Sequence, residues 1–471
     1  MPKKQKGGKY ARKPVRRFPA GACIALICAV AVLGGCLFFL AHRSGKNPPP
    51  AVLETTQAPT QPQISEATHP ETTQTETTQP VHEIARATVL STGDLLIHQS
   101  VLNAALQSDG SYNFDNIFQY AREYIQSADY SVANLEVTLC GTDNGFPYKG
   151  KDLSFNCPDE LVDSAKDAGF DMLLTANNHS YDTILVGFKR TLEVVRSKGL
   201  ATLGTYLSAD ETKWTIQEIN GIKVGMLCYT YANGVGSHGE PKLNGNAEIA
   251  EPGLCNFFTY DNLDRFYDEV AGYLADMRAA GADATLFYIH WGEEYVLGTV
   301  PRQREIAQKL CDLGVDVILG GHPHVMEPME LLSATDDPER KTVCLYSMGN
   351  AISNQRLGNI SRVKTSHTED GCLFQVSFSK YSDGKVYLDD VTLIPCWVNM
   401  LSNPRQYFIL PLDDSTRDSW QEKYDLTDTA LNAATASYDR TQEIVGEGLQ
   451  ACRDYLAQQK EDRNAAYLQA A

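Results

Sequence analysis

Residues 315–324 read VDVILGGHPH, a run of strand-forming apolar residues that ends in glycine and histidine. A short aliphatic run of this kind, bounded by glycine, is typical of a buried β-strand. In α/β folds, binding and catalytic side chains gather just beyond the carboxyl ends of the strands. The stretch therefore predicts an α/β fold in which His322 and His324 lie at the functional edge of a sheet.

The same arrangement recurs from about residue 85 to about residue 400. Apolar runs alternate with segments in which apolar residues recur every three or four positions, and this alternation indicates an α/β fold. The predicted strands are 86–92, 129–135, 171–176, 284–290, 315–319 and 343–348, and the predicted helices are 115–127, 159–168, 183–198, 260–280 and 302–313. Hairpin turns are expected at Asn220-Gly221 and Ser382-Asp383-Gly384, so antiparallel strands join the sheet.

Polar clusters follow six of these apolar runs. A single histidine after a strand is more often a capping or hydrogen-bonded residue than a ligand. Six strand ends that all supply Asp, Glu, Asn or His make coincidence improbable, and these side chains suit hard or borderline divalent cations. A divalent ion would hold a phosphate oxygen and lower the pKa of a water nucleophile. The clusters are Gly93-Asp94, Asn134-Leu135-Glu136, Asn177-Asn178-His179, His290-Trp291-Gly292, Gly321-His322-Pro323-His324 and Gly349-Asn350.

The residue types and the order of these clusters resemble those of the CapA family of capsule-synthesis proteins, within the calcineurin-like metallophosphoesterase superfamily. The resemblance implies a four-layer αββα metallophosphoesterase-like sandwich and a metal-dependent phosphoesterase-like site. It also implies a role in the synthesis or export of a poly-γ-glutamate capsule. Whether the chain is an enzyme, such as a metal-dependent hydrolase, stays open at this point.

The resemblance also implies a role for each strand-end residue. One or two divalent ions, of manganese, iron or zinc, would be held by Asp94, Glu136, Asn178, His290, His322 and His324. His179 would lie outside this ligand set and act as the catalytic general acid, donating a proton to a leaving oxygen.

Two motifs differ from the superfamily pattern. Its Asp-x-His motif reads Asp94-Leu95-Leu96 here, so His98 is the nearby candidate for the missing ligand. Its Gly-Asp-x-x-Asp motif is replaced by Asn134-Leu135-Glu136, which keeps a carboxylate on a longer side chain. Asn350 is a further candidate site residue.

The N-terminal region predicts a membrane anchor. Residues 1–17 are basic and form a predicted cytoplasmic tail, and the uncharged run within 18–41 is long enough to span a hydrocarbon core of roughly 30 Å. The positive-inside rule then predicts a single-pass cell-membrane protein whose C-terminal domain is extracytoplasmic. A cleaved signal peptide and lipoprotein processing at Cys36 are the open alternatives.

The remaining boundaries follow from composition. Residues 42–84 are rich in Thr, Pro and Gln and predict a disordered linker. Residues 85–410 form the predicted CapA-like domain, and 411–471 form a predicted C-terminal helical extension.

Charge limits the choice of partners. Residues 51–471 hold 31 basic and 59 acidic residues, a net charge of −28, so nucleic acid should be repelled. An anionic polymer would meet the same repulsion unless basic residues converge near the site. The candidates are Lys149, Lys151, Arg302, Arg356, Arg362 and Lys364.

Two functions of different classes therefore compete. The first is metal-dependent hydrolysis or transfer at a phosphoester, amide or ester of a cell-envelope polymer, which the presence of His179 favours. The second is a non-catalytic polymer-binding subunit of a membrane capsule assembly, with polymer synthase subunits as partners, which the loss of the Asp-x-His ligand favours. A sensor or adhesin on a stalk is a third reading, supported by the linker alone.

Overall fold

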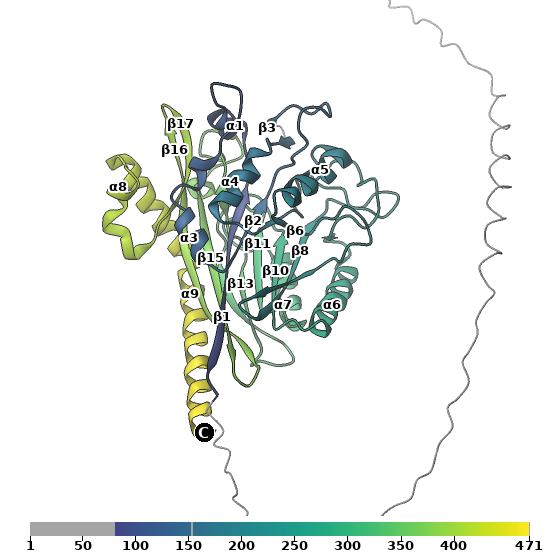
Figure 1. Ribbon diagram of the computed structural model, residues 1–471, viewed down its shortest axis with the longest axis vertical. Coiled ribbons are helices and arrows are strands. Elements are labelled where there is room, and N and C mark those ends of the chain that lie inside the picture. The colour runs from purple at the N-terminus through teal and green to yellow at the C-terminus, as the bar shows by residue number, and fades with distance from the viewer. Residues whose placement is uncertain (1–80, 152–153, 471) are drawn as a thin grey trace, which may run out of the picture. The chain divides into compact units, whose positions relative to one another are not determined.

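Two mixed β-sheets form the centre of the folded region (Figure 1). The structure, a computed structural model, describes residues 81–151 and 154–470. The first sheet has the order β17-β16-β15-β1-β2-β5-β6, and β14 also pairs with β1. Its strands are β1 (Glu83–Leu95), β2 (Tyr130–Leu135), β5 (Met172–Leu174), β6 (Ala201–Leu203), β14 (Asn350–Ile352), β15 (Asp370–Tyr381), β16 (Val386–Ser402) and β17 (Arg405–Pro411).

The second sheet has the order β12-β13-β11-β10-β8-β7, with β9 paired to β8. The neighbours of β10 on both sides run parallel to it, whereas β7 and β12 are antiparallel edge strands. The strands are β7 (Thr215–Ile219), β8 (Ile222–Tyr231), β9 (Phe257–Phe258), β10 (Ala284–His290), β11 (Val317–Gly321), β12 (Met329–Ser333) and β13 (Lys341–Leu345); β3 (Lys149–Lys151) and β4 (Ser154–Asn156) form a separate hairpin.

Alternation of side chains along the strands sets the order of the layers. In β10, Leu286 and Tyr288 point into the core between the two sheets, whereas Phe287 and Ile289 point outward against helices α6 and α7. In β1, Val89 faces the second sheet. Because side chains of a strand alternate between faces, each sheet buries both of its faces. The order is therefore helix, sheet, sheet, helix, which confirms the predicted α/β class and a sandwich of mixed sheets.

The helices cover the outer faces of the two sheets. Helices α1 to α4 pack on the first sheet, and α6 and α7 pack on the second. Their bounds are α1 (Gln99–Ala105), α2 (Asp115–Phe118), α3 (Arg122–Ser127), α4 (Glu160–Ala168), α5 (Ile184–Ser197), α6 (Leu263–Ala279), α7 (Pro301–Asp312), α8 (Trp420–Lys423) and α9 (Asp428–Ala470). The predicted helix 115–127 is thus two short helices, and both predicted hairpin turns occur, at β7–β8 and β15–β16.

The predicted single-pass membrane location, with an extracytoplasmic C-terminal domain, is corrected here. Across 81–151 and 154–470 there is no helix both long and apolar enough to cross a membrane. Helix α9 has the length, at 43 residues, but charged side chains such as Arg440 and Arg453 occur along it. The predicted tail 1–17, the anchor 18–41 and nearly all of the linker 42–84 lie outside the described residues.

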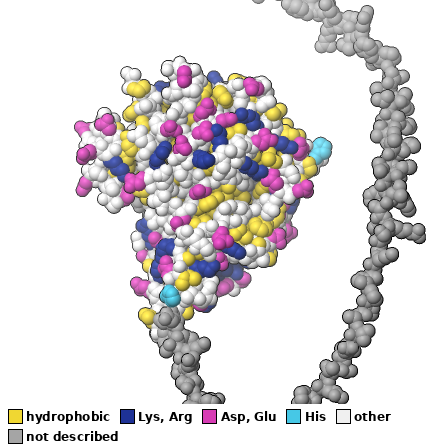
Figure 2. Space-filling model, viewed as in Figure 1, with side chains coloured by type: hydrophobic (Ala, Val, Ile, Leu, Met, Phe, Trp, Pro, Cys, Tyr) yellow, Lys and Arg dark blue, Asp and Glu magenta, His cyan; other side chains and the backbone are white. Residues whose placement is uncertain are grey.

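Surface charge is mixed rather than segregated on the face that Figure 2 shows. Acidic and basic side chains alternate over the described residues of this face, and apolar side chains lie between them. An anionic partner would therefore not be recognised on this face by bulk charge. Recognition of an anion has to come from a local arrangement of donors.

Helix α9 is fixed to the first sheet by an ion pair whose carboxylate is buried. Arg440 donates to Asp370, the first residue of β15, with an Nη2–Oδ1 distance of 2.6 Å and an Nε–Oδ2 distance of 2.9 Å. The hydroxyl of Ser437 donates to the same carboxylate at 2.6 Å. Burial raises the pKa of Asp370 to about 6, although Arg440 and Ser437 favour the charged form.

We expect the substitution Arg440→Met to lower the free energy of unfolding by about 2–3 kcal/mol, because it leaves the buried Asp370 carboxyl without its charged partner. Urea unfolding of the full-length chain measures the loss. Arg302→Met is the matched control, since Arg302 pairs with Glu305 at the surface, and it should cost under about 1 kcal/mol. Equal losses for the two variants would contradict this account of the α9 anchor.

Candidate metal centre

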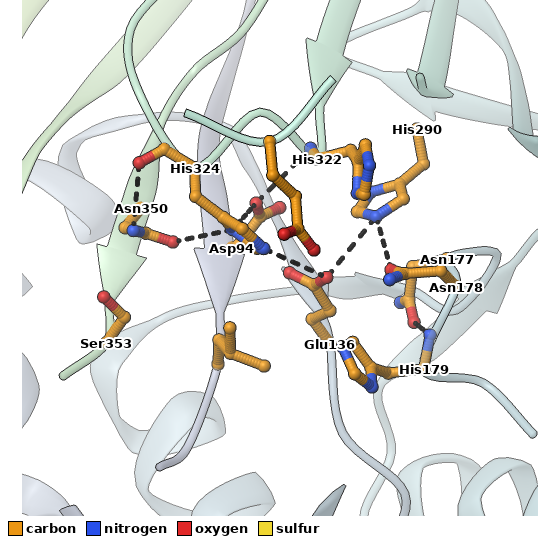
Figure 3. A network of polar contacts seen from close by, with 12 residues as sticks. Asp94, Glu136, Asn177, Asn178, His179, His290, His322, His324, Asn350 and Ser353 are labelled. Carbon is orange, nitrogen blue, oxygen red and sulfur yellow. Dashed lines mark hydrogen bonds and ion pairs between the residues drawn. The ribbon is translucent and has the colours of Figure 1, made fainter. Parts of the chain in front are cut away.

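The strand-end residues meet where the carboxyl ends of β1, β2, β10 and β11 converge (Figure 3). Parallel pairing places Asp94 opposite Asn134 of β2 and opposite Asn350 of β14. In the second sheet, His290 pairs with Gly321, which directly precedes His322. The first sheet therefore supplies carboxylates to the site, and the second sheet supplies imidazoles.

Asp94 and His324 form one side of the site. The Oδ2 atom of Asp94 lies 3.1 Å from Nδ1 of His324, and its Oδ1 atom accepts a 2.7 Å hydrogen bond from the Asn134 amide. The side chain of Asn350 lies 3.1 Å from the same Nδ1 and donates to the His324 carbonyl oxygen. The pKa of Asp94 is lowered overall, since His324, His290 and Asn134 outweigh the opposing effect of burial.

Glu136 lies at the centre of the site and is fully buried. Neither of its carboxylate oxygens accepts a hydrogen bond from a residue that the structure describes. Its Oε1 atom lies 3.4 Å from Nε2 of His290 and 3.8 Å from Nε2 of His324. Burial raises the pKa of Glu136 well above its usual value, and the nearby charges of Asp94 and Glu294 raise it further.

Within residues 81–151 and 154–470, two groups of side chains could hold a metal ion, and Glu136 belongs to both. One is Glu136, His290 and His322, and the other is Asp94, Glu136 and His324; within each group the ligand atoms lie within 4.8 Å of one another. The Nδ1 atom of His322 is also buried without a hydrogen-bond partner. Buried carboxylate and imidazole atoms without partners are the donor set that a manganese, iron or zinc ion requires, so these residues fit a divalent cation.

His290 and His322 are held as neutral rings. Burial lowers the pKa of His290 to about 3 and lowers that of His322 well below its usual value. Metal ions bind the neutral form of imidazole. The backbone of His322 has a φ of 96° and that of His324 a φ of 57°, in the left-handed region that non-glycine residues rarely adopt. Such strain is typical of functional sites, where the surrounding structure imposes a conformation on the side chain.

His179 lies outside both metal-holding groups. Its Nδ1 atom lies 2.8 Å from Oδ2 of Asp182 and 3.3 Å from the Asn244 amide nitrogen, and the Phe155 ring packs edge-on at 4.6 Å. The Oδ1 atom of the neighbouring Asn178 lies 2.9 Å from Nε2 of His290, beside the group formed by Glu136, His290 and His322. Because Nδ1 of His179 is occupied, the Nε2 atom is the one left to exchange a proton.

His98 does not join the site in the way that the sequence suggested. Its Nδ1 atom accepts a 3.2 Å hydrogen bond from the backbone amide of Asn354, and its ring packs on Phe155. It belongs to neither metal-holding group. Strand β1 therefore contributes one ligand candidate, Asp94.

Sequence reasoning passed over two residues of the site. Tyr231, at the end of β8, places its ring 4.7 Å from that of His322, but tyrosine is not among the usual ligands of these ions. Asp182 orients His179, and the His-x-x-Asp spacing of 179–182 was the available signal.

Comparison with known proteins assigns the family. The family described as "Bacterial capsule synthesis protein PGA_cap" matches residues 88–355, more than half of the chain, and this range contains both metal-holding groups. The chain belongs to this CapA family. The capsule biosynthesis protein CapA of Bacillus anthracis is 27% identical over 368 residues, which cover 76% of this chain and 81% of that protein.

A second CapA relative, the PGA biosynthesis protein CapA of Bacillus subtilis (strain 168), is 26% identical over 334 residues, covering 70% of this chain and 78% of that protein. A solved structure, that of the protein TT1561 from Thermus thermophilus, covers 61% of this chain and 93% of its own, with 9% identity and a TM-score of 0.31. Membership of the family therefore rests on the sequence match.

Glu327 connects the loop that carries His322 and His324 to helix α7. Its Oε2 atom accepts a 2.7 Å hydrogen bond from Nε2 of Gln303, and its Oε1 atom is buried with no partner in the described part of the chain. Burial raises the pKa of Glu327 from 4.5 to about 8. The folded chain therefore binds more protons at this residue than the unfolded chain does between these two values.

The wild type should lose stability as pH rises because of Glu327, and we expect the substitution Glu327→Gln to abolish this loss. Because the folded-state pKa is the higher one, the free energy of unfolding should fall between about pH 4.5 and 8, on the order of 5 kcal/mol for this residue. Urea unfolding at pH 5 and pH 8.5 should show that the free energy of unfolding of the variant rises relative to that of the wild type across this range. The exposed Glu339→Gln is the control, and a Glu327→Gln variant with the same pH dependence as the wild type would contradict the assignment.

Proposed function

We propose that this chain acts in the synthesis or export of a bacterial poly-γ-glutamate capsule, through a divalent-metal site with phosphoesterase-like chemistry. The sharing of Glu136 by two buried groups, with both of its oxygens lacking hydrogen bonds, is the observation that carries the proposal. Membership of the capsule synthesis family supports the biological role. The helix, sheet, sheet, helix order supports the finer assignment to a metallophosphoesterase-like sandwich.

The residues of the chain have distinct tasks in this mechanism. The cation would be held by Asp94, Glu136, Asn178, His290, His322 and His324, and Oδ1 of Asn178 lies 2.9 Å from Nε2 of His290. When bound, a divalent ion supplies Lewis acidity and lowers the pKa of water. The burial of all these side chains keeps bulk water away and strengthens their electrostatic effect on a substrate.

His179 is the proposed general acid. Asp182 holds the ring by its Nδ1 atom, and Phe155 packs against its edge, so the Nε2 atom has a fixed position from which to donate a proton to a leaving oxygen. Asp182 is thus a positioning residue. It acts on the reaction through the orientation of His179.

A non-catalytic polymer-binding subunit is the second candidate function. The observation that favours it is the position of His98, which binds the Asn354 amide instead of completing the ligand set of β1. A weaker metal site would serve binding better than turnover. In either case we propose an anionic polymer and polymer synthase subunits as partners.

We expect His322→Ala and His179→Ala to have different effects on the full-length protein. Loss of His322 removes a ligand candidate and should sharply reduce bound manganese, iron or zinc, measured by mass spectrometry of the metals. Loss of His179 should leave metal content nearly unchanged while hydrolysis of a generic phosphodiester falls by about 100-fold or more.

The control for both variants is His238→Ala, because His238 is an exposed histidine away from both groups. Metal retained with hydrolysis lost in the His179 variant supports the enzyme. Metal retained with capsule formation intact in that variant supports the binding subunit. A wild-type chain that binds none of the three metals at micromolar concentration would refute the proposed site.

A further inference from the structure

One cation lies beside the metal-holding groups and faces solvent. The side chain of Arg362 is 64% exposed, and its Nη2 atom lies 2.8 Å from Oε2 of Glu294. Its guanidinium lies 5.7 Å from the centre of the Tyr295 ring. The Tyr295 ring in turn lies 6.1 Å from the ring of His324, so a single aromatic side chain separates Arg362 from the candidate ligands.

Tyr231 presents a donor toward the same place. Its ring lies 4.7 Å from that of His322 and is parallel to that of His290, with 3° between the two planes. Within the described part of the chain, its hydroxyl makes no hydrogen bond. Burial raises the pKa of this phenol, and the charges of Glu294 and Glu136 raise it further, whereas the charge of Arg362 opposes them. The phenol is therefore a neutral donor at pH 7.

The other arginines proposed from the sequence are engaged elsewhere. Arg356 donates to Glu369 and to the backbone carbonyl of Val398, and Arg302 pairs with Glu305 on α7. Figure 2 shows mixed charge rather than a basic surface on the face it presents. Arg362, by contrast, lies one aromatic ring away from His324, because Tyr295 lies between them.

Arg362 can exchange its ion pair with Glu294 for an ion pair with another anion. Arg362 is mostly exposed, so an ion pair there stabilises the fold by little. A guanidinium binds a phosphate or a second carboxylate by the same paired donors that it offers to Glu294. A divalent cation bound at the neighbouring metal-holding groups would also attract the arriving anion, whereas Glu294 would repel that anion.

We propose that Arg362 and Tyr231 form a subsite for the anionic group of the substrate, and that Glu294 occupies Arg362 until this group displaces it. The inference rests on the proposed function, because the subsite adjoins the residues assigned to the metal. The ligand class is an oxyanion, from either a phosphate ester or a side-chain carboxylate of a γ-linked glutamate polymer. Arg362 and Tyr231 would orient this group toward His322 and His290.

The test is isothermal titration calorimetry of the full-length protein with two probes, inorganic phosphate and a γ-linked glutamate trimer, each with and without excess manganese. We expect Arg362→Gln to weaken binding of the recognised probe about tenfold or more, and Arg362→Lys to restore part of it. Tyr231→Phe should weaken binding by roughly 3–10-fold, the effect of one neutral hydrogen bond. Glu294→Gln should strengthen binding, because the competing carboxylate is removed.

Arg302→Gln is the control, since Arg302 is an arginine of similar exposure that also pairs with a glutamate. The probe whose affinity responds identifies the source of the oxyanion. The proposal is overturned if Arg362→Gln binds both probes as Arg302→Gln does, if Glu294→Gln weakens binding as Arg362→Gln does, or if the wild type binds neither probe. Metal content is measured on the same samples. If the chain binds manganese normally but its affinity for both probes does not depend on Arg362, the subsite alone is refuted and the proposed function is not.

Discussion

The burial of Glu136 without a hydrogen-bond donor is the constraint on which the site depends. A carboxylate that leaves water without compensation costs several kcal/mol, and two buried oxygens lacking partners are rare in folded proteins. His290 and His324 approach one of these oxygens, and because burial lowers the pKa of His290 to about 3, the His290 ring does not supply a full positive charge. A divalent cation bound between them would offset the cost, and it explains why imidazoles and a second carboxylate converge on the same point.

The fold brings these groups together through two sheets rather than one. The parallel pairs β1–β2 and β10–β11 each end at the site, and the apolar core between the sheets fixes the separation of those ends. Neither sheet alone holds both carboxylate and imidazole ligands. The left-handed backbone at His322 and His324 turns both rings into the space above the strand ends, and Glu327 braces the same loop against α7. Metal binding and sheet packing are therefore coupled in this chain.

The strand-end residues were predictable because they follow from local pattern. Apolar runs of strand length mark where each strand ends, and a parallel sheet places those ends together, so Asp94, Glu136, His290, His322 and His324 could be grouped from sequence. Contacts made by loops were not predictable in this way. Nothing local indicates that His98 binds the Asn354 amide or that Asn244 reaches His179, since those partners lie 256 and 65 residues apart in sequence. The membrane location was inferred from an apolar run outside the described residues, and no described helix bears it out.

Anomalous diffraction from crystals of the full-length protein grown with manganese tests the central claim most directly, because it locates the ion as well as detecting it. The account predicts one or two anomalous peaks within coordination distance of the Glu136 carboxylate, one on the side of His290 and His322 or one on the side of Asp94 and His324. A map with no peak beside Glu136, from a protein saturated with manganese, would contradict it.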